Sequence, residues 1–114
     1  MGVVYYANYL VWFEVARADW LRSLGWTYRE MEESGVFLPV IDARCEYKRP
    51  AMYDDEVEIR TTGQLLSPIR VAFSYIVTIK GKRDVAAVGE TTHAATGRDG
   101  RPCRLPQRVR EVFA

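Results

Sequence analysis

Cysteine and histidine are scarce in this chain of 114 residues, which has two cysteines and one histidine. Two cysteines are too few for a disulfide framework, so we expect Cys45 and Cys103 to be reduced thiols in a cytoplasmic protein. A metal cluster cannot be built around a lone histidine, and we therefore expect no metal site. We predict that His93 is a hydrogen-bonded or interface histidine.

The chain also lacks an excess of charge of either sign. Its 16 Lys and Arg residues face 15 Asp and Glu residues, a net charge of +1, and the two signs are interleaved. Such a surface gives no field for binding nucleic acid. No uncharged apolar run approaches the roughly 20 residues of a membrane span, and no basic segment precedes the apolar N-terminal stretch as in a signal peptide.

Two catalytic motifs are missing as well. No Gly-rich phosphate loop and no serine nucleophile elbow occurs in the sequence. What remains is an ordinary soluble composition, with 48% hydrophobic and 27% charged residues. This length and composition predict one globular domain with a substantial core.

The most informative stretch is an apolar segment near the N-terminus. Its apolar residues recur at spacings of three and four, which predicts a central, buried helix over residues 8–24. Asn8 is expected to cap its first turn, and Gly25 to end it. The apolar positions are Leu10, Val11, Trp12, Phe13, Val15, Ala16, Trp20, Leu21 and Leu24.

Short helices and strands are predicted after Gly25. Thr27 and Glu30 form a capping box for a short helix that ends near Gly35. Alternating apolar and polar residues then predict strands over 41–48, 56–61, 69–80 and 85–96, the first half-buried between Pro39 and Pro50. Turns are expected at 81–83 and 99–100, and a last short helix over 106–113.

This order predicts an α+β domain. Four antiparallel strands joined by hairpins have one apolar face to cover, and the long helix is the element able to cover it. The Ala-rich last strand would let that helix lie close. We therefore expect the sheet to wrap around one long central helix.

A family resemblance agrees with this architecture. The pattern Gly-x-Val-x-x-x-x-Tyr from Gly2, followed by Phe-Glu-x-Ala-Arg from Phe13, resembles the signature of hotdog-fold acyl-CoA thioesterases. It is closest to the 4-hydroxybenzoyl-CoA thioesterase-like group, which includes the Tol-Pal-associated thioesterases. The run Gly-Arg-Pro-Cys-Arg-Leu-Pro at 100–106 extends the likeness, so residues 1–114 are expected to form one hotdog domain without the family's first strand.

The resemblance implies roles for residues at the helix N-terminus. The backbone N–H of Tyr6 would stabilise the oxyanion, with Asn8 beside it. Close relatives carry His where this chain has Tyr6. The family's catalytic Asp falls two positions before Met1, which leaves Glu14 as the carboxylate within the motif, although an ion pair between Glu14 and Arg17 is also expected.

Further residues are expected to contact an acyl-CoA substrate. Tyr9, Trp12 and Phe13 would lie against the acyl group. Arginines suit the CoA phosphates because they form paired hydrogen bonds with them, and CoA would enter as part of the substrate, with no separate cofactor. The predicted CoA-binding residues are Ser67, Arg70, Arg98, Arg101 and Arg104.

Two functions remain open from the sequence. The first is a cytoplasmic acyl-CoA thioesterase, a homodimer or a tetramer of paired dimers, acting on a small or medium acyl group. The second is a non-catalytic hotdog module that binds acyl-CoA or a partner, since the catalytic Asp is not in the chain. A hotdog dehydratase fits less well because His93 lies far from the helix motif.

Overall fold

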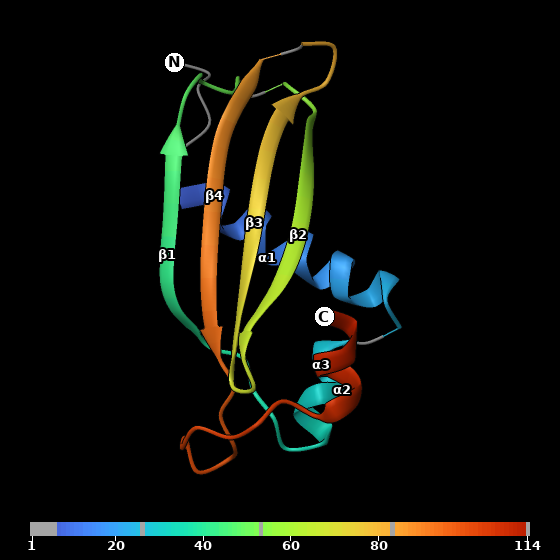
Figure 1. Cartoon of the computed structure of the whole chain (residues 1–114). Coiled ribbons are helices and arrows are strands. Elements are labelled where there is room, and N and C mark those ends of the chain that lie inside the picture. Colours follow the sequence, from blue (N-terminus) through green and yellow to red (C-terminus); the bar gives the residue numbers. More distant parts are fainter. Residues whose placement is uncertain (1–6, 26, 53, 83, 114) are drawn as a thin grey trace.

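The computed structural model describes residues 7–25, 27–52, 54–82 and 84–113. One long helix lies across one face of a four-stranded sheet, and two short helices lie together near one end of it (Figure 1). This arrangement confirms the predicted α+β hotdog architecture. The elements are α1 (Ala7–Ser23), α2 (Tyr28–Glu33), β1 (Val40–Tyr47), β2 (Val57–Ser67), β3 (Arg70–Ile79), β4 (Val85–Ala94) and α3 (Gln107–Phe113).

The strands are antiparallel in the order β1-β4-β3-β2. Two of the three connections are the predicted hairpins, β2 to β3 and β3 to β4. The connection from β1 to β2 is not a hairpin, which corrects the prediction, because it passes from one edge of the sheet to the other. Lys48 and Arg49 both donate backbone hydrogen bonds to the Ala86 carbonyl, so the chain leaving β1 stays beside β4.

β3 carries the core of the sheet, as its alternation predicts. Its inward positions are all buried, whereas Arg70 and Ser74 are exposed. Being central, β3 has a strand on each side and α1 across its inner face, so its inward side chains are at most 5% exposed. The buried positions are Val71, Phe73, Tyr75, Val77 and Ile79.

β1 differs from its prediction as a half-buried strand. Seven of its eight residues are exposed, and only Cys45 is partly buried. Apolar and polar residues alternate in the sequence of β1, but burial does not follow this pattern. The reason is that β1 is an edge strand and α1 covers little of its inner face. Near its end, the Tyr47 ring meets Tyr9 of α1 edge to face, with centroids 5.0 Å apart.

α1 is likewise buried on one side only. Tyr9, Phe13 and Leu21 are in the core, whereas Leu10, Val11 and Val15 are 46%, 55% and 56% exposed. The prediction of a helix buried all round is therefore wrong for the single chain, because one sheet can cover only one side of a helix.

The ends of α1 match the predictions in part. The helix begins at Ala7, so Asn8 lies inside the first turn and is not the predicted cap. The other end is as expected, since Gly25 has a φ of 89° and donates its N–H to the Arg22 carbonyl.

Two glycines let the aromatic residues of α1 approach the sheet. A methyl group at Gly89 of β4 would collide with the Phe13 ring, and one at Gly63 of β2 would lie 2.6 Å from the Trp20 ring. The prediction that small residues of the last strand let the helix lie close is confirmed at Gly89 and extends to Gly63 of β2. The close packing fixes where α1 crosses the sheet.

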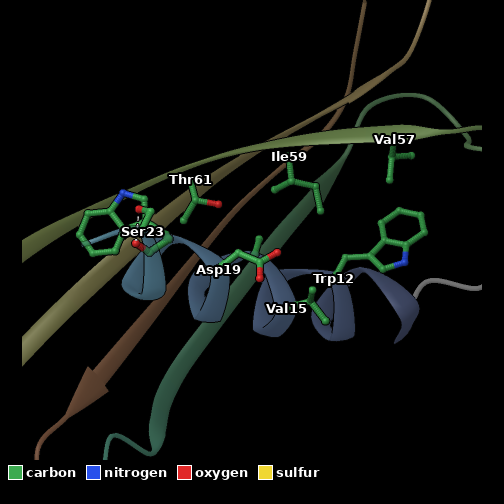
Figure 2. Close-up of a pocket in the computed structure, with 9 residues that line it drawn as sticks. Trp12, Val15, Asp19, Ser23, Val57, Ile59 and Thr61 are labelled. Atoms are coloured by element: carbon green, nitrogen blue, oxygen red, sulfur yellow. Dashed lines mark hydrogen bonds between the residues drawn. The ribbon is translucent and has the colours of Figure 1, made fainter. Parts of the chain in front are cut away.

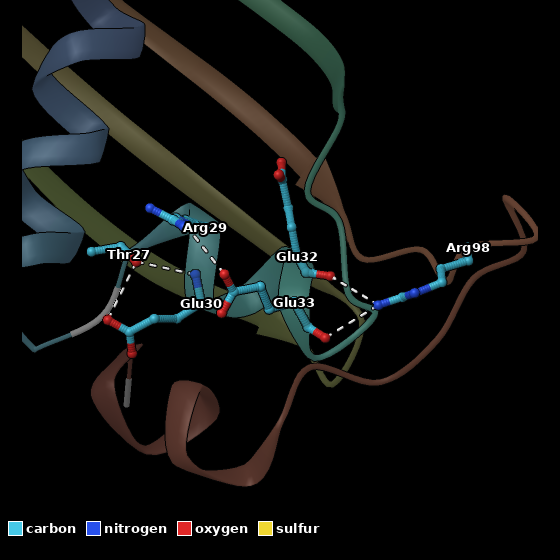
Figure 3. A network of polar contacts seen from close by, with 6 residues as sticks. All are labelled: Thr27, Arg29, Glu30, Glu32, Glu33 and Arg98. Carbon is cyan, nitrogen blue, oxygen red and sulfur yellow. Dashed lines mark hydrogen bonds and ion pairs between the residues drawn. The ribbon is translucent and has the colours of Figure 1, made fainter.

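The predicted capping box of α2 forms in part: Thr27 caps the helix, but the Glu30 carboxylate accepts from the Thr27 hydroxyl and not from the Thr27 N–H. The Glu30 N–H donates to the Thr27 hydroxyl at 3.1 Å, and that hydroxyl lies 3.3 Å from the Glu30 carboxylate (Figure 3). Gly35, with a φ of 90°, follows the helix where a stop is predicted. The closing helix α3 also forms, and Phe113 packs against Trp20 and Phe73.

Candidate active site

The first turn of α1 is the predicted site of carbonyl activation. The first N–H groups of a helix have no partner within it, so they can donate to an oxyanion. Tyr6 lies outside the described residues, and its backbone role stays a prediction. Asn8 is described, and its side chain is exposed in this turn. No acidic residue lies in the first turn within the described part of α1.

The predicted acyl-contacting residues fall into two groups. Tyr9 and Phe13 are buried, 2% and 0% exposed. Phe13 stacks on Tyr75 with centroids 4.2 Å apart and an interplanar angle of 8°. Trp12 is only partly buried and packs its ring 4.8 Å from Tyr9. Of these three side chains, Trp12 is thus the one open to a ligand in the single chain.

Trp12 lines a groove between α1 and β2 of about 480 Å³, a volume typical of small-molecule sites (Figure 2). The groove is mainly apolar, and the buried hydroxyl of Thr61, one of its lining residues, has no hydrogen-bond partner among the described residues. No local motif indicates this groove, although alternation along β2 marks the inward residues that form its wall. It is lined by Trp12, Val15, Ala16, Asp19, Trp20, Ser23, Val57, Ile59 and Thr61.

A second cavity of about 460 Å³ lies on the other side of α1, towards α2 and the segment before β1. Burial raises the pKa of Tyr28 to about 12, and the neighbouring Arg17 charge partly offsets this effect. The Tyr28 hydroxyl is buried beside the Arg17 guanidinium. The lining residues are Glu14, Arg17, Tyr28, Glu32, Phe37, Leu38, Pro39 and Thr96.

The predicted Glu14–Arg17 ion pair does not form between these two described residues. The Arg17 guanidinium donates instead to the Tyr75 hydroxyl, at 3.5 Å, because that hydroxyl lies on the sheet directly below the helix. Glu14 is exposed on α1 at the edge of the second cavity. Its carboxylate is therefore open to solvent and available to a ligand.

Three of the predicted CoA-binding residues lie close together. Ser67 and Arg70 flank the β2–β3 turn, where the Pro68 carbonyl accepts a bond of 2.9 Å from the Leu105 N–H. That contact brings Arg104 beside the turn. The cluster lies well away from the start of α1, because Arg70 pairs with Ala94 whereas Tyr47, which meets Tyr9, pairs with Ala87. Along β4, Ala87 and Ala94 are seven positions apart, which corresponds to roughly 23 Å.

The other two predicted CoA-binding arginines make local contacts. Arg98 donates to the carbonyls of Glu32 and Glu33, at 3.5 and 3.2 Å, where they complete the C-terminal end of α2 (Figure 3). Arg101 lies 3.9 Å from the Asp99 carboxylate and is exposed. Gly100 forms the predicted turn between them, with a φ of 78°.

His93 is a hydrogen-bonded core residue, one of the two predicted alternatives. It is fully buried, its Nδ1 lies 3.0 Å from the Leu38 carbonyl, and its Nε2 lies 2.9 Å from the Thr91 hydroxyl. Burial lowers the pKa of His93 to about 4. Among the described residues, no group of three His, Cys, Asp or Glu side chains could hold a metal ion.

Comparisons with known proteins identify the family. Residues 1–113 match the model of the thioesterase-like superfamily. A protein of Aquifex aeolicus that is provisionally named an esterase is 37% identical to this chain over 112 residues. The match covers 98% of this chain and 85% of that protein.

Solved structures agree. A DHNA-CoA thioesterase from Staphylococcus aureus superposes with a TM-score of 0.86 at 36% identity, covering 92% of this chain and 70% of that one. A gentisyl-coenzyme A thioesterase superposes with a TM-score of 0.85 at 28% identity, covering 98% and 87%. The chain therefore belongs to the thioesterase-like superfamily and has the hotdog fold of these enzymes.

Proposed function

We propose that this chain hydrolyses the thioester bond of a small or medium acyl-CoA. The observation that carries the proposal is the superposition on an acyl-CoA thioesterase across 92% of the chain, at 36% sequence identity. In the reaction, a water oxygen bonds to the acyl carbon and the carbon–sulfur bond breaks. The products are a carboxylic acid and CoA, whose thiolate takes up a proton.

The first turn of α1 would stabilise the charge that develops on the carbonyl oxygen. Backbone N–H groups aimed at this oxygen act more strongly in the intermediate than in the substrate, and the helix dipole adds to their effect. We assign the main donor to the N–H of Tyr6, with Asn8 beside it in the first turn.

A carboxylate is needed to activate the water or to attack the carbonyl itself. Family resemblance gives this role to an Asp two positions before Met1. Glu14 is the alternative within the chain, and its exposed position beside the second cavity supports keeping it as a candidate.

The acyl group would lie against Trp12 in the groove between α1 and β2, whose apolar lining suits both aromatic and aliphatic groups. The CoA phosphates would bind Arg70 and Arg104 beside Ser67 at the β2–β3 turn. Arg98 and Arg101 would then contribute mainly through the long-range field, because their guanidinium groups already have local contacts.

We also propose a homodimer, with pairing into tetramers as an extension. Among the described residues no strand pairs with the outer edge of β1, and the β1 side chains are exposed together with one side of α1. Light scattering that gave only the mass of one chain, 13.1 kDa, at micromolar concentration would refute this.

A cytoplasmic location is proposed from the free thiols of Cys45 and Cys103. No helix in the described ranges is long and apolar enough to cross a membrane.

A non-catalytic acyl-CoA-binding module is the second candidate. It is favoured by the lack of an acidic residue in the described first turn of α1. Its test is a thiol-specific assay of CoA release from benzoyl-, 4-hydroxybenzoyl-, gentisyl- and short aliphatic acyl-CoA. The chain as printed and a form carrying an N-terminal extension that supplies Asp are compared.

Hydrolysis is expected in the extended form, and a rate lower by about 10²–10⁴ in the chain as printed. Acyl-CoA binding without CoA release in both forms would support the binding module instead. Full activity of the printed chain that is lost in Glu14→Gln would make Glu14 the catalytic acid.

A further inference from the structure

A continuous chain of polar groups runs beneath α1. The Arg17 guanidinium lies 3.5 Å from the Tyr75 hydroxyl, which lies 2.7 Å from the Thr91 hydroxyl. That hydroxyl lies 2.9 Å from Nε2 of His93, and Nδ1 of His93 lies 3.0 Å from the Leu38 carbonyl. Tyr75, Thr91 and His93 are 1%, 2% and 0% exposed, so water does not compete for the two bonds that join them, whereas the bond from Arg17 is only partly buried.

The two ends of the chain fix the direction of every bond in it. The Leu38 carbonyl can only accept, so Nδ1 of His93 carries the proton, and Nε2 of the neutral ring is an acceptor. Thr91 must then donate to His93, and its oxygen accepts from Tyr75. Arg17 has no acceptor, so it donates to Tyr75. The low pKa of His93 agrees, since it keeps the imidazole neutral at pH 7.

Tyr75 contacts two successive turns of α1. Phe13 stacks on its ring, and Arg17, four residues later on the same helical face, donates to its hydroxyl. The stack sets how close the helix lies, at the gap left by Gly89. The hydroxyl bond adds a polar attachment between the packing contacts of Phe13 at Gly89 and Trp20 at Gly63, and so helps to hold the direction of α1 across the sheet.

This attachment lies close enough to the first turn to matter for catalysis. Arg17 follows Ala7, the first residue of α1, by ten positions, roughly 15 Å along a helix. A small change in the direction of α1 is therefore multiplied at its N-terminal end. Displacing a reacting group by about 1 Å can reduce a rate by about 10²-fold.

We propose that Tyr75 is a positioning residue for thioester hydrolysis: its hydroxyl, oriented by Thr91 and His93, holds Arg17 and thereby aims the first turn of α1. The inference rests on the proposed function. It predicts that breaking the polar chain at a distance from the substrate lowers kcat and leaves KM nearly unchanged.

The test breaks the chain at two links. Tyr75→Phe keeps the ring that stacks on Phe13 and removes the hydroxyl. Thr91→Val keeps the shape of Thr91 and removes its hydroxyl. Each change is expected to reduce kcat about ten-fold, with KM altered by less than about three-fold, and the double variant should be no slower than either single one, because both act on the same chain.

A matched control separates positioning from a general loss of stability. Thr91→Ser keeps the bridging hydroxyl and should retain kcat within about two-fold. If Tyr75→Phe and Thr91→Val keep the wild-type kcat, or if Thr91→Ser is as slow as Thr91→Val, the proposal is overturned.

A second readout does not depend on activity. His93 is the single histidine, so nitrogen NMR of the imidazole gives one pair of signals. A protonated Nδ1 and an accepting Nε2 that shifts in Thr91→Val support the chain, whereas a protonated Nε2 refutes it. Wild-type protein with this NMR pattern but no hydrolysis would refute the proposed function and the positioning role while leaving the polar chain itself established.

Discussion

His93 should make the stability of this protein sensitive to mild acid. Burial lowers the pKa of His93 from the ordinary value of 6.5 to about 4 in the folded chain. The unfolded chain binds a proton near pH 6.5, whereas the folded chain resists it until about pH 4. The stability linked to the neutral ring is thus fully present above pH 6.5 and is lost as pH falls from 6.5 to about 4.

The magnitude follows from the size of the shift. A difference of one unit in pKa corresponds to about 1.4 kcal/mol, so the shift of His93 is worth about 3 kcal/mol between pH 7 and pH 4. For a single domain of this size that is a large part of the total stability. The loss has a structural cause, because a proton on Nε2 turns that atom into a donor facing the Thr91 hydroxyl, which must then rotate away from it.

Urea denaturation of wild-type protein and His93→Asn at several pH values measures this loss. The Asn amide can still donate to the Leu38 carbonyl but does not titrate, so carboxylate effects common to both proteins cancel. The unfolding free energy of the wild type should fall by about 3 kcal/mol more than that of His93→Asn between pH 7 and pH 4. Parallel pH profiles, or an NMR titration of His93 with a midpoint near 6.5, would refute the reasoning.

Three further predictions concern packing, capping and substrate binding. Gly89→Ala should lower the unfolding free energy by about 1–3 kcal/mol, because the added methyl group collides with Phe13; an unchanged melting temperature would show that α1 can move away at no cost. Thr27→Ala should lower it by about 1 kcal/mol through loss of the α2 cap, whereas Thr27→Ser should not, and equal losses in the two variants would contradict the capping role. In steady-state kinetics, Arg70→Ala and Arg104→Ala should each raise KM for acyl-CoA about ten-fold with little change in kcat, and a KM unaffected in both would exclude the β2–β3 turn as the phosphate site.

Sequence patterns correctly predicted those features that depend on interactions between neighbouring residues. The Thr27 cap of α2 and the stop at Gly35 depend on residues a few positions apart, and both formed as expected. The alternation in β3 was also sufficient, because a central strand shows its burial pattern whatever its partners are.

Sequence patterns did not predict the contacts between residues that are far apart in the chain. β1 looks half-buried by alternation, but its burial depends on its place at the edge beside β4, which the sequence does not specify. The expected ion pair between Glu14 and Arg17 was wrong for the same reason, since Arg17 bonds to Tyr75, 58 residues away. The groove beside Trp12 also requires β2 to lie next to α1, a contact that no local motif indicates.

The central claim, that a backbone N–H at the start of α1 polarises the thioester carbonyl, is tested most directly at Tyr6. In a form that hydrolyses acyl-CoA, Tyr6→Phe keeps the N–H and should change kcat by only a few-fold. Tyr6→Pro removes the N–H at a place where helices tolerate proline, and should lower kcat by about 10²–10³, with circular dichroism confirming the fold. Equal losses in Tyr6→Phe and Tyr6→Pro would contradict the claim, because the hydroxyl and not the backbone would then be the essential group.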